Sequence, residues 1–159
     1  GPIGEWDVSR VTDMEKIFDD ASSFIGDISK WDVSRVTTMS SMFMDAKSFK
    51  GDLSKWDVSS VASLASMFAG AVNFGRTSSF FISLPMEWDV SSVTDMSRMF
   101  SNAEVFNGEI SDWDVSRVTD MSRMFEGAMV FDRDVSKWDV SGVQNMDQTL
   151  VVNISLEEI

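Results

Sequence analysis

Residues 113–131 read WDVSRVTDMSRMFEGAMVF, and variants of this string recur along the chain. Every copy starts with Trp-Asp-Val-Ser, and successive tryptophans are 25, 25, 32, 25 and 25 residues apart: Trp6, Trp31, Trp56, Trp88, Trp113 and Trp138. Self-similarity at a period of about 20–50 residues is the sequence signature of stacked repeat architectures. The chain is therefore predicted to be a repeat protein, and positions below are counted from each tryptophan as zero.

The apolar residues after each tryptophan follow a helical spacing. Val occupies +5 and Met or Leu +8 in all six copies, and Phe occupies +12 and Ala +15 in five. Separations of three, four and three residues are typical of one face of an α-helix. Thr at +6 is a suitable N-cap, and Asp at +7 suits a first helical turn. Each repeat is therefore predicted to contain a short helix of about two turns.

A second pattern precedes each predicted helix. In Ile28–Val33, which reads ISKWDV, the pair Trp31 and Val33 has the period of two that suits a short β-strand. A glycine five residues before the tryptophan supplies a turn back from helix to strand in four copies: Gly1, Gly26, Gly51 and Gly108.

A repeat with one strand, one helix and one tight turn cannot bury its apolar side chains alone, so the copies must stack. We predict an α/β solenoid, a right-handed stack with a parallel sheet on one face and short helices on the other. Residues 1–159 are predicted to form this single solenoid of about six 25-residue repeats. An insertion is expected near residues 75–86, and a degenerate C-terminal repeat or cap at 138–159.

The first residues align with the interior of a repeat, since Gly1 to Trp6 matches Gly26 to Trp31. This register favours native sequence over a tag remnant for Gly1 and Pro2. We therefore expect the natural protein to continue upstream, or the chain to sit in a larger assembly.

The composition excludes several kinds of function. Asp and Glu number 26 against 13 Lys and Arg, a formal charge of −13. This charge disfavours nucleic acid and anionic membrane surfaces as partners, because both require a concentrated basic face. The chain has no Cys and no His, which removes thiol nucleophiles, disulfides, Cys/His zinc sites and imidazole acid–base chemistry. No apolar run approaches the roughly 18 residues of a membrane-spanning helix. We expect no cofactor and no direct membrane insertion.

The repeat also resembles a known family. The run Ile28-x-x-Trp31-x-Val33-x-x-Val36 resembles the L-x-x-L-x-L-x-x-N core of leucine-rich repeats, with Val in place of Asn. The longer string Trp-Asp-Val-Ser-x-Val-Thr-Asp-Met-Ser-x-Met-Phe-x-x-Ala-x-x-Phe-x-Gly resembles the BspA-like leucine-rich-repeat family over nearly the whole chain. This resemblance implies a leucine-rich-repeat-like stack in a bacterial or protist surface protein, often an adhesin or lipoprotein, that binds protein or glycan. It implies an extracellular or cell-surface location and supplies no catalytic residue.

The most regular polar feature is aspartate at +1: Asp7, Asp32, Asp57, Asp89, Asp114 and Asp139. Between Trp and Val of a strand, these side chains are expected to face outward in a column about 5 Å apart, where like charges repel. They are interpreted first as acceptors of hydrogen bonds from Ser at +3, from backbone N–H groups and from flanking Lys and Arg. A second interpretation is a Ca²⁺ site, because this ion takes about 6–8 oxygen ligands, with Asp57, Asp89 and Asp114 as candidates. A third is an acidic strip that docks a basic partner, and its four candidate contacts are Asp32, Asp57, Asp89 and Asp114.

The period is broken once, by an insertion between Phe74 and Trp88. Four large apolar side chains make this segment unusual for a loop: Phe80, Phe81, Ile82 and Leu84. Insertions in repeat stacks map to surface loops that often bind, so these side chains are candidate anchors for a partner. The alternative is that they cover the edge of the stack, with Leu84 or Met86 replacing the aliphatic residue missing at −3.

The sequence thus predicts a non-catalytic repeat protein that binds another protein or glycan, as a fragment of a surface or adhesin-type protein. A glycan-processing enzyme would need one repeat that differs chemically from the others, and none does. The alternative is a structural scaffold or linker subunit of a large protein assembly, in which the insertion would be permanently buried.

Overall fold

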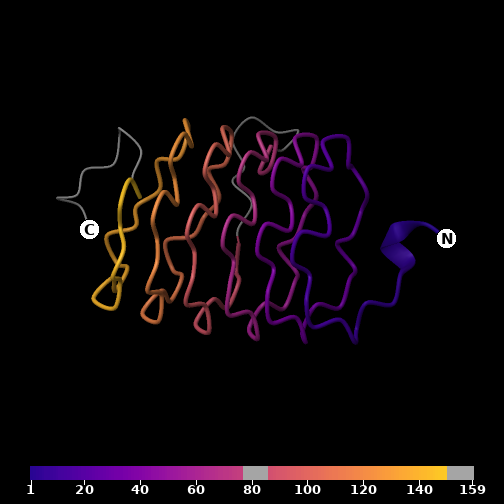
Figure 1. Ribbon diagram of the computed structural model, residues 1–159, viewed down its shortest axis with the longest axis horizontal. Coiled ribbons are helices and arrows are strands. Elements are labelled where there is room, and N and C mark those ends of the chain that lie inside the picture. The colour runs from indigo at the N-terminus through magenta and orange to yellow at the C-terminus, as the bar shows by residue number, and fades with distance from the viewer. Residues whose placement is uncertain (77–85, 150–159) are drawn as a thin grey trace.

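The chain winds into a row of coils that stack side by side from the N-terminus towards the C-terminus (Figure 1). This computed structural model describes residues 1–76 and 86–149. Within these ranges the only helix is η1, a 3-10 helix at Ile3–Glu5, and no helix there is long and apolar enough to cross a membrane. Strand pairing in the same ranges consists of five isolated parallel bridges at +7: Asp13–Thr38, Thr38–Ser63, Ser63–Asp95, Asp95–Asp120 and Asp120–Asn145. We number the coils 1 to 6 by their tryptophans, from Trp6 to Trp138.

The predicted α/β solenoid, with a parallel sheet on one face and short helices on the other, is therefore wrong. The segment expected to be helical is a series of turns, and the segment expected to be a strand, Ile28–Val33, forms no bridge. The one bridge that joins each pair of neighbouring coils lies at +7, where the first helical turn was expected.

In coils 1 to 5, two residues of the predicted helix have a left-handed backbone, which a right-handed helix cannot contain. All six residues at +10 have φ between 54° and 59°: Lys16, Ser41, Ser66, Arg98, Arg123 and Gln148. Five residues at +14 have φ between 54° and 69°: Asp20, Asp45, Gly70, Asn102 and Gly127. The chain therefore reverses direction twice within the segment that was expected to be one helix.

The apolar spacing of three residues arises from β-turns. In coil 2, the N–H of Val36 donates to the carbonyl of Val33 at 2.9 Å, and the N–H of Ala46 donates to that of Phe43 at 3.1 Å. The first and last residues of these turns are all buried. A β-turn brings residues i and i+3 close together, so it places an apolar pair on the inner side as a helix does.

Backbone groups that a helix would pair internally join neighbouring coils instead. Between coils 2 and 3, N–H groups at +8, +10, +12 and +14 donate to carbonyls at +7, +9, +11 and +13, at 2.7 to 3.1 Å. Two examples are Met39 to the carbonyl of Ser63 and Phe43 to that of Met67. Because each bond contributes about 0.5–1.5 kcal/mol net, the stack is stabilised along its whole length.

Aromatic side chains fill the interior in two columns. The rings at +12 stack between coils with centroids 5.4 to 5.8 Å apart, and those at +18 stack at 5.7 to 6.1 Å. Within each of coils 1 to 5 the two rings also stack, at 3.7 to 4.1 Å. The tryptophan indoles of coils 2 to 6 each donate to a carbonyl of the preceding coil, at 2.8 to 3.2 Å. Among the described residues, no buried side-chain nitrogen or oxygen lacks a hydrogen-bond partner.

Candidate functional site

The six aspartates at +1, which we call the Asp strip, are all exposed. In each, Oδ1 accepts a hydrogen bond from the backbone N–H of the serine at +3, at 3.0 to 3.1 Å. In coils 1 to 5 the serine hydroxyl donates to the same oxygen at 2.6 Å. The Asp-Val-Ser sequence therefore closes a small local ring in every coil, which holds the carboxylate in a fixed position.

These hydrogen bonds lower the pKa of five carboxyl groups in the Asp strip. Donation from the serine hydroxyl is the largest cause and donation from the serine N–H the second, because both favour the ionised form. The five groups are Asp7, Asp32, Asp89, Asp114 and Asp139. These five carboxylates therefore remain charged at mildly acidic pH.

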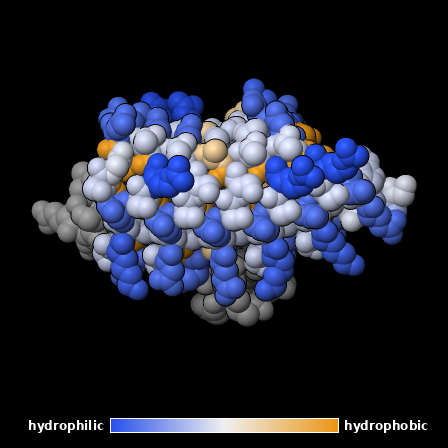
Figure 2. All heavy atoms as spheres, turned by 90° about the horizontal axis from the view of Figure 1, so that it is seen from below, coloured by the Kyte–Doolittle hydropathy of each residue, from blue (hydrophilic) through white to orange (hydrophobic). Residues whose placement is uncertain are grey.

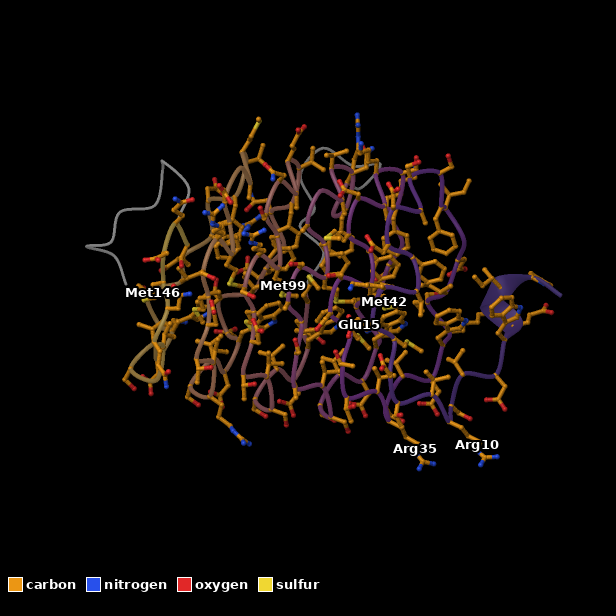
Figure 3. All side chains as sticks on the ribbon, in the orientation of Figure 1. Arg10, Glu15, Arg35, Met42, Met99 and Met146 are labelled. Atoms are coloured by element: carbon orange, nitrogen blue, oxygen red, sulfur yellow. The ribbon has the colours of Figure 1, made fainter. Side chains whose placement is uncertain are left out.

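Flanking cations do not neutralise the Asp strip. The four ion pairs among the described residues join other partners: Lys16–Glu15, Arg123–Glu126, Arg133–Glu109 and Lys137–Asp112. Arg10 and Arg35 project away from the body of the stack (Figure 3). The face on that side carries rows of hydrophilic side chains (Figure 2). Serine hydroxyls and backbone N–H groups are thus the partners of these carboxylates.

The Ca²⁺ interpretation has no geometric support. Across residues 1–76 and 86–149, no three acidic side chains come together in a group that could hold a metal ion. Asp57, Asp89 and Asp114 instead each bind the serine of their own coil. In each repeat, the aspartate at +1 thus receives its hydrogen bonds from the serine of the same coil.

Lowered pKa values in the folded state predict acid-sensitive stability. The carboxylates contribute stability above 3.8, the reference pKa of aspartate, and lose it as the pH falls through their lower folded-state values. We expect chemical unfolding to give a constant free energy above about pH 5 and a decreasing one below about pH 4. This acid-induced loss should shrink when three serine hydroxyls are removed by Ser34→Ala, Ser91→Ala and Ser116→Ala.

A matched triple variant controls for the loss of serine itself. It changes surface serines whose side chains do not contact an aspartate: Ser22→Ala, Ser23→Ala and Ser92→Ala. The free energy of unfolding that this control variant loses at acidic pH should equal the loss of the wild type. An equal loss in all three proteins would contradict the assignment of the pKa shifts to the serine hydroxyls.

The apolar insertion cannot be placed in the site. The candidate anchors Phe80, Phe81, Ile82 and Leu84 lie outside the described residues. Met86, at its end, is buried, and its carbonyl accepts a hydrogen bond from Nε1 of Trp113 at 2.8 Å. The corresponding acceptors in other coils belong to aliphatic residues at −3, such as Ile28 and Leu53. Met86 thus takes over this structural role from one position further along the chain.

A surface groove of about 370 Å³ crosses coils 2 to 4, and we call it the coil-3 groove. Coil 3 contributes small or short side chains to its lining: Ser66, Ala69, Gly70 and Val72. Coil 2 contributes Met44, Asp45 and Lys47. Coil 4 contributes Arg98, Ser101 and Asn102. The groove therefore follows the one coil whose outer side chains are smaller than those of its neighbours.

Gly70, at +14 of coil 3, lines the groove, and the Asp45 side chain of coil 2 lies against it. A Cβ atom on Gly70 would lie 2.3 Å from Oδ1 of Asp45, so the Asp45 carboxylate occupies the space above this glycine. Lys47 and Arg98 are exposed on opposite sides of the groove, and neither belongs to an ion pair with another described residue. The groove thus combines two cationic side chains with hydroxyl, amide and carboxylate groups.

Sequence reasoning missed the coil-3 groove, although a signal was present. At +13 and +14, coil 2 has Met44 and Asp45, and coil 3 has Ala69 and Gly70. The repeated residues show what the copies share, whereas a groove arises where one copy differs.

Comparison with known families shows to which repeat family the chain belongs. The family described as "Mycoplasma protein of unknown function, DUF285" matches twice, at residues 1–84 and 74–156. The chain therefore belongs to this repeat family. No curated protein and no solved structure matches the chain significantly.

Proposed function

We propose that this chain is a non-enzymatic binding protein, which resembles BspA-like surface repeats and recognises another protein or glycan outside the cell. The coil-3 groove carries the proposal, because it is a recess on a regular stack and lies within the usual volume range of ligand sites, about 300–1,000 Å³. The inter-coil hydrogen bonds and aromatic columns beneath it fix its two sides in position, which lowers the entropic cost of binding.

The Asp strip supports the proposal as a second contact region. Its carboxylates are exposed and fixed by hydrogen bonds, so little side-chain entropy is lost when a partner contacts them. A partner that contacts the strip would carry basic groups there. Asp32, Asp57, Asp89 and Asp114 remain the candidate contacts on this strip.

Filling the groove should abolish binding without unfolding the chain. Ala69→Met introduces the side chain that coil 2 has at the same position, Met44, so the backbone accepts it. We expect the wild type to bind at least one ligand in a panel of immobilised glycans and surface-protein ectodomains, and Ala69→Met to lose that binding at least tenfold, about 1.4 kcal/mol. Biolayer interferometry measures the affinities of the wild type and of Ala69→Met for each panel member.

The control is Ala62→Thr, which places at an exposed position the residue found there in four other coils. It should bind as the wild type does. If no panel member binds, or if both variants bind normally, the groove has no recognition role. The alternative of a structural scaffold or linker subunit would then be favoured, because the continuous hydrogen bonds and aromatic columns also suit a spacer.

A further inference from the structure

We infer that the coil-3 groove binds an acidic saccharide, with a sugar carboxylate held between Lys47 and Arg98. This inference rests on the proposed binding function and names the ligand class of the same groove. It is carried by the charge of the groove, by the hydrogen-bonding groups that line it and by the backbone beneath it.

The charges of the groove differ in sign from those of the chain. Two cations and one carboxylate line it, giving a local charge of +1 (2 − 1), whereas the whole chain carries −13. Lys47, at +16 of coil 2, and Arg98, at +10 of coil 4, both line this groove from either side of coil 3, so an anion bound in it can contact both side chains. Charge-assisted hydrogen bonds from such groups are roughly twice as strong as neutral ones.

The rest of the lining suits sugar hydroxyl groups. The hydroxyl of Ser66, the amide of Asn102 and the carboxylate of Asp45 line the same groove as the two cations. Ser101 is buried, and its hydroxyl accepts a hydrogen bond from the Asn102 amide at 3.4 Å. Together these groups both donate and accept hydrogen bonds, as the hydroxyl groups of a sugar ring require. Met44, Ala69 and Val72 form the apolar part of the lining, against which the ring of a sugar can pack.

The backbone of the groove disfavours an extended peptide as the occupant. Strand addition needs free N–H and carbonyl groups at a sheet edge. Here the N–H of Ser66 donates to the carbonyl of Ser97 at 2.8 Å, and the N–H of Gly70 donates to that of Ser101 at 2.8 Å. Strand addition is therefore excluded here, and a ligand of the groove must be recognised by the side chains of the groove.

Three probes separate the possible ligands: trigalacturonic acid, the neutral trisaccharide galactotriose and a hexaglutamate peptide. We expect NMR titration of the ¹⁵N-labelled chain with trigalacturonic acid to shift the amide signals of Lys47, Gly70 and Arg98. Affinity should fall as the NaCl concentration rises, because the contact is ionic. Galactotriose and hexaglutamate should bind at least tenfold more weakly.

Two variants test the cations with residues that the repeat already uses. Arg98→Gln introduces the residue at the same position of coil 6, Gln148, which also has a left-handed backbone. Lys47→Ser introduces the residue that coil 1 has there, Ser22. Each should weaken trigalacturonic acid binding about tenfold or more. Arg123→Gln, the same change one coil beyond the groove, is the control and should not alter it.

Equal binding of the neutral and acidic trisaccharides would overturn the role of the two cations, as would normal binding by Arg98→Gln. Binding of hexaglutamate alone would replace the saccharide with an acidic peptide. None of these three results would contradict the proposed binding function. If none of the three probes binds, the saccharide assignment is wrong, and the Ala69→Met panel decides the binding function independently.

Discussion

Trp88→Ala should lower the free energy of unfolding by about 3–5 kcal/mol, measured by urea denaturation. The Trp88 ring is buried and stacks between Phe68 and Trp113, with centroids 6.4 and 6.3 Å away. Its Nε1 donates to the carbonyl of Leu53 at 2.9 Å. Truncation therefore opens a cavity and also leaves a buried carbonyl without its partner, which costs about 1–3 kcal/mol by itself.

Two matched variants divide this loss into its causes. Trp88→Phe keeps an aromatic ring and removes the indole N–H, so it should cost about 1–3 kcal/mol. Trp6→Ala is the same substitution at a tryptophan that is 57% exposed, and it should cost less than about 1 kcal/mol. If Trp88→Ala cost no more than Trp6→Ala, the stacked interior described here would be wrong.

The repeat and its buried residues could be predicted from the sequence, but the secondary structure could not. Burial at Val36, Met39, Phe43 and Ala46 follows from the repeated apolar positions, and all four are buried. A spacing of three residues is compatible with both a helix and a β-turn, so it does not determine the backbone. The deciding signal was at +10 and +14, where polar residues and glycine stand in every described coil.

These two positions also show why local propensity was misleading. Lys16 and Arg98 at +10 favour helices in isolated peptides, yet both have a left-handed backbone here. The hydrogen bonds that each coil makes with the next, four for each of coils 1 to 4, outweigh this preference. Asp45 and Asn102 at +14 are more informative, because Asn and Asp tolerate the left-handed region better than most residues.

The candidate site could be predicted only in part. Because Asp and Ser recur two residues apart, the hydrogen bonds of Asp32 and Asp57 with Ser34 and Ser59 were among the interpretations, and they are present. The flanking Lys and Arg side chains were also expected to bind these carboxylates. However, none of the ion pairs among the described residues includes an aspartate of the Asp strip. The coil-3 groove depends on contacts between three neighbouring coils, which a pattern within one repeat does not contain.

Gly127→Ala should destabilise the chain by about 1–2 kcal/mol, although in an α-helix the same change would stabilise it by about 1 kcal/mol. Gly127 has φ of 69°, and a Cβ atom there would lie 2.3 Å from Oδ1 of Asn102. An L-residue is strained at this φ, and the Asn102 side chain must also move. Urea denaturation of the wild type and the variant gives the sign directly, and a more stable variant would restore the helical prediction.

Gly127→Asn separates backbone strain from crowding. Asn occupies the equivalent position in coil 4, at Asn102, with φ of 54°, so its intrinsic strain is smaller than that of Ala. Adding Asn102→Gly to Gly127→Ala removes the crowded oxygen and leaves the strain at residue 127. We expect this double variant to recover only part of the lost stability, because left-handed strain remains. Full recovery would mean that crowding alone makes glycine necessary, and then the left-handed turn would not explain why coil 5 has no helix.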